Sequence, residues 1–96
     1  MTVIYIAGTM TGYDNFNRDA FNKKAKELAD RGYSVLNPAT LPDGLTQAQY
    51  MSICMPMVMC ADEIYMLNGW SGSGGATAEL ALAEKLGLII TFEDKR

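Results

Sequence analysis

The chain has 96 residues, a length that allows one domain with a thin hydrophobic core. Its formal net charge of −3 argues against a nucleic-acid polymer or a membrane surface as a partner, because both require basic patches. The absence of histidine excludes Ser-His-Asp and Cys-His systems and the usual zinc sites. We therefore expect a single domain, residues 1–96, without a metal or cofactor, whose reactive groups are Asp, Glu, Tyr, Lys or Cys.

The beginning of the chain and its cysteines indicate a cytoplasmic protein. Residues 1–6 carry neither a basic segment nor a long apolar run, so no signal peptide or membrane span is predicted. Cys54 and Cys60 lack the CxxC spacing, and two free thiols suit a reducing compartment.

The first third of the chain predicts a strand followed by a helix. Residues 3–7 are a short apolar run, typical of a buried parallel strand, and the loop Gly8 to Gly12 follows. Asp14 or Asn15 is expected to cap a helix that ends at Gly32. The inner face of this helix is expected to carry Phe16, Ala20, Phe21, Ala25 and Leu28.

The middle of the chain predicts a second strand and an unusually apolar helix. The strand covers residues 33–36, and the helix runs from Thr46 to Cys60. Pro56 lies inside this helix and should kink or break it. Since so small a domain cannot cover an apolar helix on all sides, we expect it to form part of the core and a homodimer or larger oligomer interface.

The last third predicts a strand at residues 63–67, a glycine-rich loop at 68–75, a helix at 76–86 and a strand at 88–92. Alternating strands and helices predict an α/β fold with a parallel sheet of four or more strands in the order 2-1-3-4. The loops at Gly8 to Gly12 and at 68–75 should meet at the carboxyl edge of this sheet, where ligands of such folds bind.

These two loops are the candidate phosphate site. Ser71 to Gly75 holds more glycine and serine than a turn requires, and it leads into a helix whose first N–H groups are unpaired. Gly8 to Gly12 lacks a full GxGxxG spacing and a Walker lysine, so it is compatible with either a tight turn or an anion cradle. The residues expected to contact a substrate are Gly8, Thr9, Met10, Asn68, Ser71, Ser73, Gly74 and Gly75.

Glu79 is the leading candidate for the reactive group. It follows the glycine-rich loop by about one turn among alanines, which favours an inward-facing carboxylate over a solvated first-turn glutamate. Tyr5 is compatible with a core position or with a hydroxyl directed at Glu79. Asp62 begins a strand at the opposite edge, where a turn or cap role is expected.

These residues resemble the nucleoside 2-deoxyribosyltransferase superfamily, and most closely its short phage-type branch. The matching segments cover nearly the whole chain in the right order: Tyr5-Ile6-Ala7-Gly8, Asn15-Phe16, Asn37-Pro38-Ala39, Ala61 to Leu67, Gly69-Trp70, and Ser73-Gly74-Gly75-Ala76 leading to Glu79-Leu80. The resemblance implies a flavodoxin-like (Rossmann-like) three-layer sandwich that forms oligomers. It also implies that Glu79 attacks C1′ of a deoxyribose while Tyr5 hydrogen-bonds its carboxylate.

Two further positions bear on the substrate and the mechanism that the resemblance implies. Transferases of free nucleosides carry an aspartate where this chain has Ser73, whereas the similar hydrolases of deoxynucleoside 5′-monophosphates carry serine. Hydrolysis or deoxyribosyl transfer on a (deoxy)nucleoside 5′-monophosphate is therefore implied. The family's second acid corresponds to Cys54, and a thiol is a poor acid at neutral pH, so Asp43 is a conceivable substitute. A non-catalytic nucleotide-binding protein is the alternative, ahead of a flavin carrier.

Overall fold

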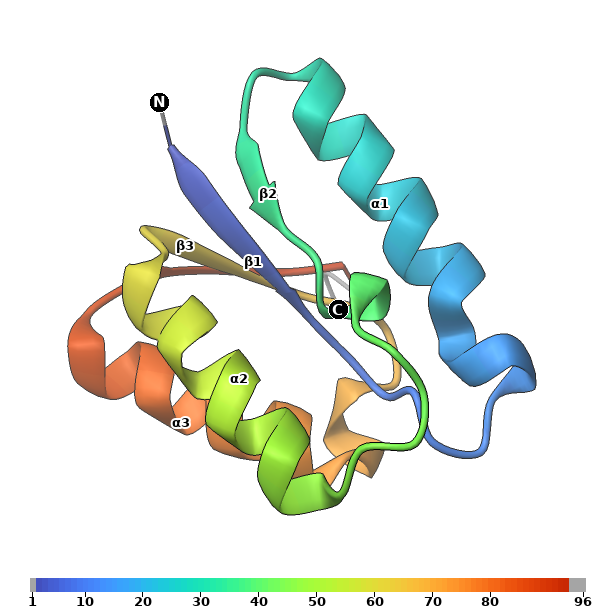
Figure 1. The fold of residues 1–96 in the computed structure, drawn as a ribbon. Coiled ribbons are helices and arrows are strands. Elements are labelled where there is room, and N and C mark those ends of the chain that lie inside the picture. The colour runs from blue at the N-terminus through green and yellow to red at the C-terminus, as the bar shows by residue number, and fades with distance from the viewer. Residues whose placement is uncertain (1, 94–96) are drawn as a thin grey trace.

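Four parallel strands form a single sheet in the computed structural model, which describes residues 2–93 (Figure 1). The strands are β1 (Val3–Ala7), β2 (Ser34–Leu36), β3 (Glu63–Met66) and β4 (Ile89–Phe92). Their spatial order is β2-β1-β3-β4, and every neighbouring pair is parallel. The predicted α/β flavodoxin-like fold and its strand order are therefore confirmed.

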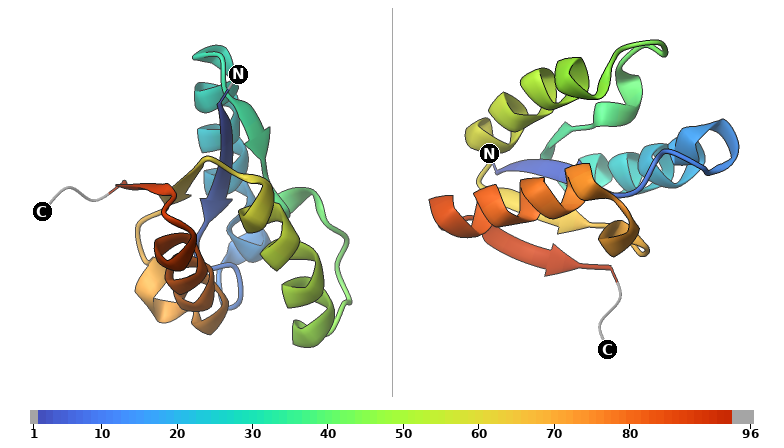
Figure 2. Two further views of the ribbon diagram at one scale, coloured as in Figure 1. Left: turned by 90° about the vertical axis from the view of Figure 1, so that its left-hand side faces the viewer. Right: turned by 90° about the horizontal axis from the view of Figure 1, so that it is seen from below.

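Helices cover both faces of this sheet and give the molecule three layers (Figures 1 and 2). α1 (Arg18–Asp30) packs on one face, and α2 (Gln47–Cys60) and α3 (Gly74–Leu86) pack on the other. Since successive strand residues point to opposite faces, the buried core divides into two clusters. The α1 side contains Ile4, Ile6, Phe21, Leu28, Ala39 and Leu67. The α2 and α3 side contains Tyr5, Ala7, Cys54, Val58, Ala61, Ile64, Met66, Ala76 and Ala83.

The segment before α1 differs from the prediction. A 3-10 turn covers Asp14–Asn17, and three consecutive residues, Asn15, Phe16 and Asn17, have positive φ angles of 50°, 55° and 61°. Neither Asp14 nor Asn15 caps the helix, because α1 begins at Arg18 after Asn17. The side chain of Asn17 donates to the carbonyl of Thr9 at 3.0 Å, so it ties this turn to the loop after β1 instead of capping α1.

The inner face of α1 is shorter than predicted, because the helix begins at Arg18 and excludes Phe16. Phe21 and Leu28 are buried and Ala25 is half-buried against the sheet, as expected. Phe16 is exposed because it lies in the turn before the helix, and Ala20 is exposed within α1 itself.

α2 is a continuous helix that begins with a capping box. The backbone N–H of Gln49 donates to the Thr46 hydroxyl at 3.1 Å, and the Gln49 side chain accepts from the Thr46 N–H at 2.9 Å. Of the two predicted effects of Pro56, a kink or a break, the break was wrong, because the helix continues through this residue. Pro56 and Ser52, whose carbonyl loses its helical partner, are both exposed, so water can hydrate that carbonyl.

The outer side of α2 presents apolar side chains to solvent. Ile53 is 38% exposed and Met59 is 62% exposed, whereas Cys54 and Val58 on the inner side are buried. Within residues 2–93, however, no helix combines the length and the apolar character needed to cross a membrane.

Candidate active site

α3 carries the leading candidate for the reactive group. The Ser73 hydroxyl accepts a hydrogen bond from the Ala76 N–H at 3.1 Å, so the helix begins at Gly74 and not at the predicted Ala76. Glu79 lies on the second turn and faces the sheet, where it is only 5% exposed. The glycine-rich segment thus supplies both the cap and the first turn of the helix that buries this carboxylate.

Tyr5 of β1 meets this carboxylate in the interior. The Tyr5 hydroxyl donates to Oε2 of Glu79 at 2.9 Å, although the two residues are 74 positions apart in the chain. The tyrosine side chain is fully buried. The structure therefore brings together the two residues that the sequence pointed to as the reactive pair.

Burial sets the protonation of both groups. Removal from water raises the pKa of Glu79 to about 7, an effect that the hydrogen bond from Tyr5 partly offsets. Burial and the neighbouring Glu79 charge raise the pKa of Tyr5, which keeps this hydroxyl protonated and able to donate. At neutral pH the Glu79 carboxyl is therefore present in both its neutral and its ionised form.

A cavity of about 260 Å³ borders this pair. Its walls come from the loop after β1, the start of α1, the segment between β2 and α2, and the facing sides of α2 and α3. The residues predicted for the site that line it are Tyr5, Gly8, Met10, Ser73, Gly75 and Glu79. The cavity thus opens where the carboxyl end of β1 and the amino end of α3 meet.

The other predicted contact residues, Thr9, Asn68, Ser71 and Gly74, are not among those that line the cavity. The Thr9 hydroxyl donates to the carbonyl of Gly69 at 2.6 Å, so it joins the two glycine-containing loops to each other. Asn68 and Ser71 are exposed on the second of these loops. The structure therefore does not place these two side chains in contact with the cavity.

Asp62 lies away from the cavity, as the sequence predicted. Its side chain accepts a hydrogen bond from the Val3 N–H at 2.9 Å, at the amino end of the sheet. This contact ties the beginning of β1 to the beginning of β3.

Cys54 lies on the cavity wall next to the reactive pair. Burial raises the pKa of the Cys54 thiol, contact with the Tyr5 hydroxyl offsets part of this rise, and the negative charge of Glu79 adds to it. The thiol is therefore held in its protonated form and is a weaker acid than a free cysteine.

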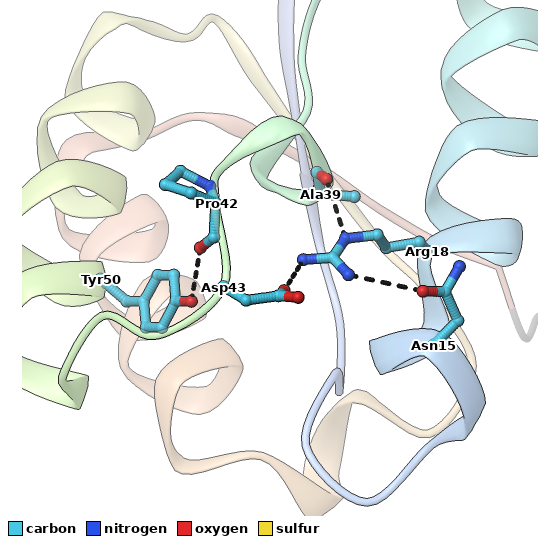
Figure 3. A network of polar contacts seen from close by, with 6 residues as sticks. All are labelled: Asn15, Arg18, Ala39, Pro42, Asp43 and Tyr50. Atoms are coloured by element: carbon cyan, nitrogen blue, oxygen red, sulfur yellow. Dashed lines mark hydrogen bonds and ion pairs between the residues drawn. The ribbon is translucent and has the colours of Figure 1, made fainter.

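The sequence did not point to Arg18, which lines the same cavity. It forms an ion pair with Asp43, and its Nε donates to the carbonyl of Ala39 at 3.3 Å (Figure 3). These partners are 25 and 21 residues away, so no local pattern marks the arginine. Asp43, which the sequence suggested as a substitute acid, thus lies on the cavity wall but is paired with a cation.

Comparison with known proteins agrees with this fold. No protein with a curated description matches the chain. Among solved structures, a 2-desoxiribosyltransferase from Leishmania mexicana superposes with a TM-score of 0.77 at 18% sequence identity. The match covers 96% of this chain but 63% of that one, so this chain spans less than two thirds of that protein. A family model described as a domain of unknown function, DUF4406, matches residues 2–92. This chain therefore belongs to the DUF4406 family.

Proposed function

We propose that this protein cleaves the N-glycosidic bond of a (deoxy)nucleoside 5′-monophosphate and transfers the sugar to water or to a second base. The observation that carries the proposal is the buried Glu79 carboxylate, held by Tyr5 on the wall of a cavity. A carboxyl group with a strongly raised pKa in a cavity is typical of reactive sites. The fold shared with a 2-desoxiribosyltransferase supports the same chemistry.

The reaction needs two displacements at C1′ of the sugar. In the first, an oxygen of ionised Glu79 forms a bond to C1′ while the bond from C1′ to the base nitrogen breaks, and the base leaves with that electron pair and takes up a proton. In the second, water or another base attacks C1′ and the bond to Glu79 breaks, which restores the carboxylate. The attacking molecule gives up a proton to solvent, which balances the proton that the first base took up. Tyr5 holds Oε2, so Oε1 remains for the attack.

The size and polar groups of the cavity favour a phosphorylated small molecule. A volume of about 260 Å³ lies just below the usual range of small-molecule pockets, which begins at about 300 Å³, so a small ligand is expected. The Ser73 hydroxyl uses an oxygen lone pair for the Ala76 N–H, so its proton remains free to be donated. The N–H of Gly75 lies in the first turn of α3, where helical partners are missing. Both groups can donate to the 5′-phosphate of a ligand in this cavity.

A second candidate function is binding of the same nucleotide without turnover. The observation that favours it is Cys54, which stands where the resemblance places an acid and whose pKa is raised by burial. A thiol that holds its proton tightly gives little help to a departing base.

Incubation with deoxyribo- and ribonucleoside monophosphates, followed by chromatography for free base, separates the two functions. We expect base release by the native protein and none by Glu79→Gln, which keeps the shape of the side chain. Glu84→Gln is the matched control, because Glu84 lies exposed on the same helix. Unchanged release by Glu79→Gln contradicts the proposed role of Glu79, whereas binding without release by the native protein selects the second function.

A further inference from the structure

The guanidinium of Arg18 lies on the cavity wall at the start of α1. Its side chain is only 20% exposed and stacks over the ring of Phe16, with 5.2 Å between the guanidinium carbon and the ring centroid. Nε donates to the Ala39 carbonyl, Nη1 donates to Oδ1 of Asn15 at 3.5 Å, and Nη2 pairs with Asp43 (Figure 3). A guanidinium has more N–H donors than these three acceptors use, so it can bind a further anion.

Arg18 is also the cationic side chain of the cavity. Among the described residues that line it, Asp43 and Glu79 are the carboxylic acids, and Arg18 is the sole lysine or arginine. Burial raises the pKa of Glu79 to about 7, which reduces the negative charge that this carboxyl carries at neutral pH. Arg18 is therefore the positive charge on the wall, opposed by Asp43 and by the ionised fraction of Glu79.

The two members of this pair differ in how firmly they are held. Arg18 is mostly buried and has three further contacts, with Ala39, Asn15 and Phe16. The Asp43 side chain is 62% exposed and lies on the segment between β2 and α2. An ion pair with so exposed a partner contributes little to stability, whereas a guanidinium can bind a phosphate through two parallel hydrogen bonds. A phosphate can therefore replace Asp43 on Arg18 more easily than Arg18 can leave the wall.

We propose that Arg18 recognises the phosphate of the ligand and that Asp43 is its internal competitor, which the phosphate displaces on binding. This inference rests on the nucleotide ligand proposed above. In the free protein the pair ties the segment Leu41 to Leu45, part of the cavity wall, to α1. The hydroxyl of Tyr50 holds the same segment to α2 through the Pro42 carbonyl at 2.7 Å (Figure 3). Displacement of Asp43 thus releases the segment from α1 while its attachment to α2 persists.

Calorimetric binding of a nucleoside monophosphate and of its nucleoside tests this exchange, in a Glu79→Gln background that prevents turnover. Arg18→Gln should weaken monophosphate binding at least about tenfold and leave nucleoside binding unchanged, because only the charged contact is lost. Asp43→Asn should strengthen monophosphate binding about threefold, since the competitor is removed. Inorganic phosphate should compete with the monophosphate in the parent protein but not in Arg18→Gln.

Matched controls come from the far end of α1. Arg31→Gln and Asp30→Asn remove the same charges from exposed positions, and both should leave the two affinities unchanged. Arg18→Lys keeps the positive charge but cannot form two parallel hydrogen bonds, so it should retain part of the preference for the monophosphate. This variant provides the test if Arg18→Gln fails to fold. Weaker or unchanged monophosphate binding by Asp43→Asn overturns the competitor role, because a merely structural ion pair predicts no gain.

These outcomes are independent of those for the proposed function. If the affinities shift as expected but the native protein releases no base, the anion exchange stands and catalysis is refuted. If base is released while Arg18→Gln and its parent bind the monophosphate equally well, the exchange is refuted and catalysis stands.

Discussion

Two glutamates are buried to a similar extent on opposite faces of the sheet, and only one of them borders a cavity. Glu79 is 5% exposed on the side of α2 and α3, and Glu63 is 8% exposed. The pairing of Glu63 with Ile4 places it in a row with the core of the α1 side. Each accepts one hydroxyl: Glu79 from Tyr5 at 2.9 Å, and Glu63 from Thr91 at 3.0 Å.

Burial alone therefore does not distinguish the two carboxylates, whereas their surroundings do. Glu63 and Thr91 belong to neighbouring strands, and their hydrogen bond satisfies two polar groups across the β3–β4 pair. Glu79 and Tyr5 come from a helix and a strand that enclose space for a ligand. We therefore expect Glu63 to stabilise the sheet and Glu79 to take part in the proposed reaction.

Replacing each glutamate by glutamine should separate the two regions most strongly. Glu79→Gln should lower base release at least about a thousandfold, because it removes the nucleophile. Glu63→Gln should change the rate less than about twofold, since an amide oxygen can still accept from Thr91. Steady-state rates with the best substrate of the panel provide the measurement, and equal losses in both variants would contradict the assignment.

The dependence of stability on pH should also distinguish them. The folded-state pKa of Glu79, about 7, lies above the ordinary value of 4.5, so the folded protein binds more protons between these pH values. The unfolding free energy should therefore fall as pH rises from about 4.5 to 7, by roughly 3 kcal/mol, and the stabilisation is fully present only at the acidic end. Urea unfolding should show this decline in Glu63→Gln but not in Glu79→Gln.

The two hydroxyl donors offer a subtler comparison. In the proposed reaction ionised Glu79 is the attacking form, so kcat/KM should fall as pH drops below about 7. Tyr5→Phe removes the hydrogen bond that lowers the Glu79 pKa. The acidic limb of the profile of kcat/KM against pH should therefore move to higher pH, and the rate at pH 7 should fall about tenfold. Thr91→Val should destabilise the fold by about 1 kcal/mol and leave the limb in place. An unshifted limb in Tyr5→Phe would argue that Glu79 is not the titrating group.

The smallest effect on stability is expected outside both regions, on the outer side of α2. Met59 is 62% exposed, and we predict that it lies in an interface between copies of the chain. Met59→Lys should weaken self-association, because burial of a charge is unfavourable, and should change monomer stability by less than about 0.5 kcal/mol. Sedimentation at micromolar concentration checks this, and a monomeric native protein would refute the interface.

Much of the fold could be predicted because its signals are local. The apolar runs of β1 and β3, the glycine after α3 and the alternation of elements identify the strands and their order without any tertiary information. That order left Tyr5 compatible with a core position or with contact to Glu79, and the family resemblance implied the contact. Even so, α3 begins before the predicted Ala76, because Ser73 prefers to cap the helix.

The features that escaped prediction depend on distant contacts. The left-handed turn at Asn15 to Asn17 is unfavourable for a residue such as Phe16, and it is fixed by the contact of Asn17 with the Thr9 carbonyl. Arg18 becomes a cavity residue only because the chain returns past it at Ala39 and Asp43. No pattern within α1 indicates which polar residue will face a ligand.

The separation of Tyr5 and Glu79 along the chain has a consequence for the order of folding. Their hydrogen bond spans 74 residues, and the bond between Val3 and Asp62 spans 59. Contacts between such distant residues form slowly, because closing a long loop costs entropy before the contact is gained. We therefore expect the pairing of β1 with β3 and the contact of Tyr5 with Glu79 to form late. Recovery of ligand binding during refolding should accordingly report the final stage of folding, after the helical signal has returned.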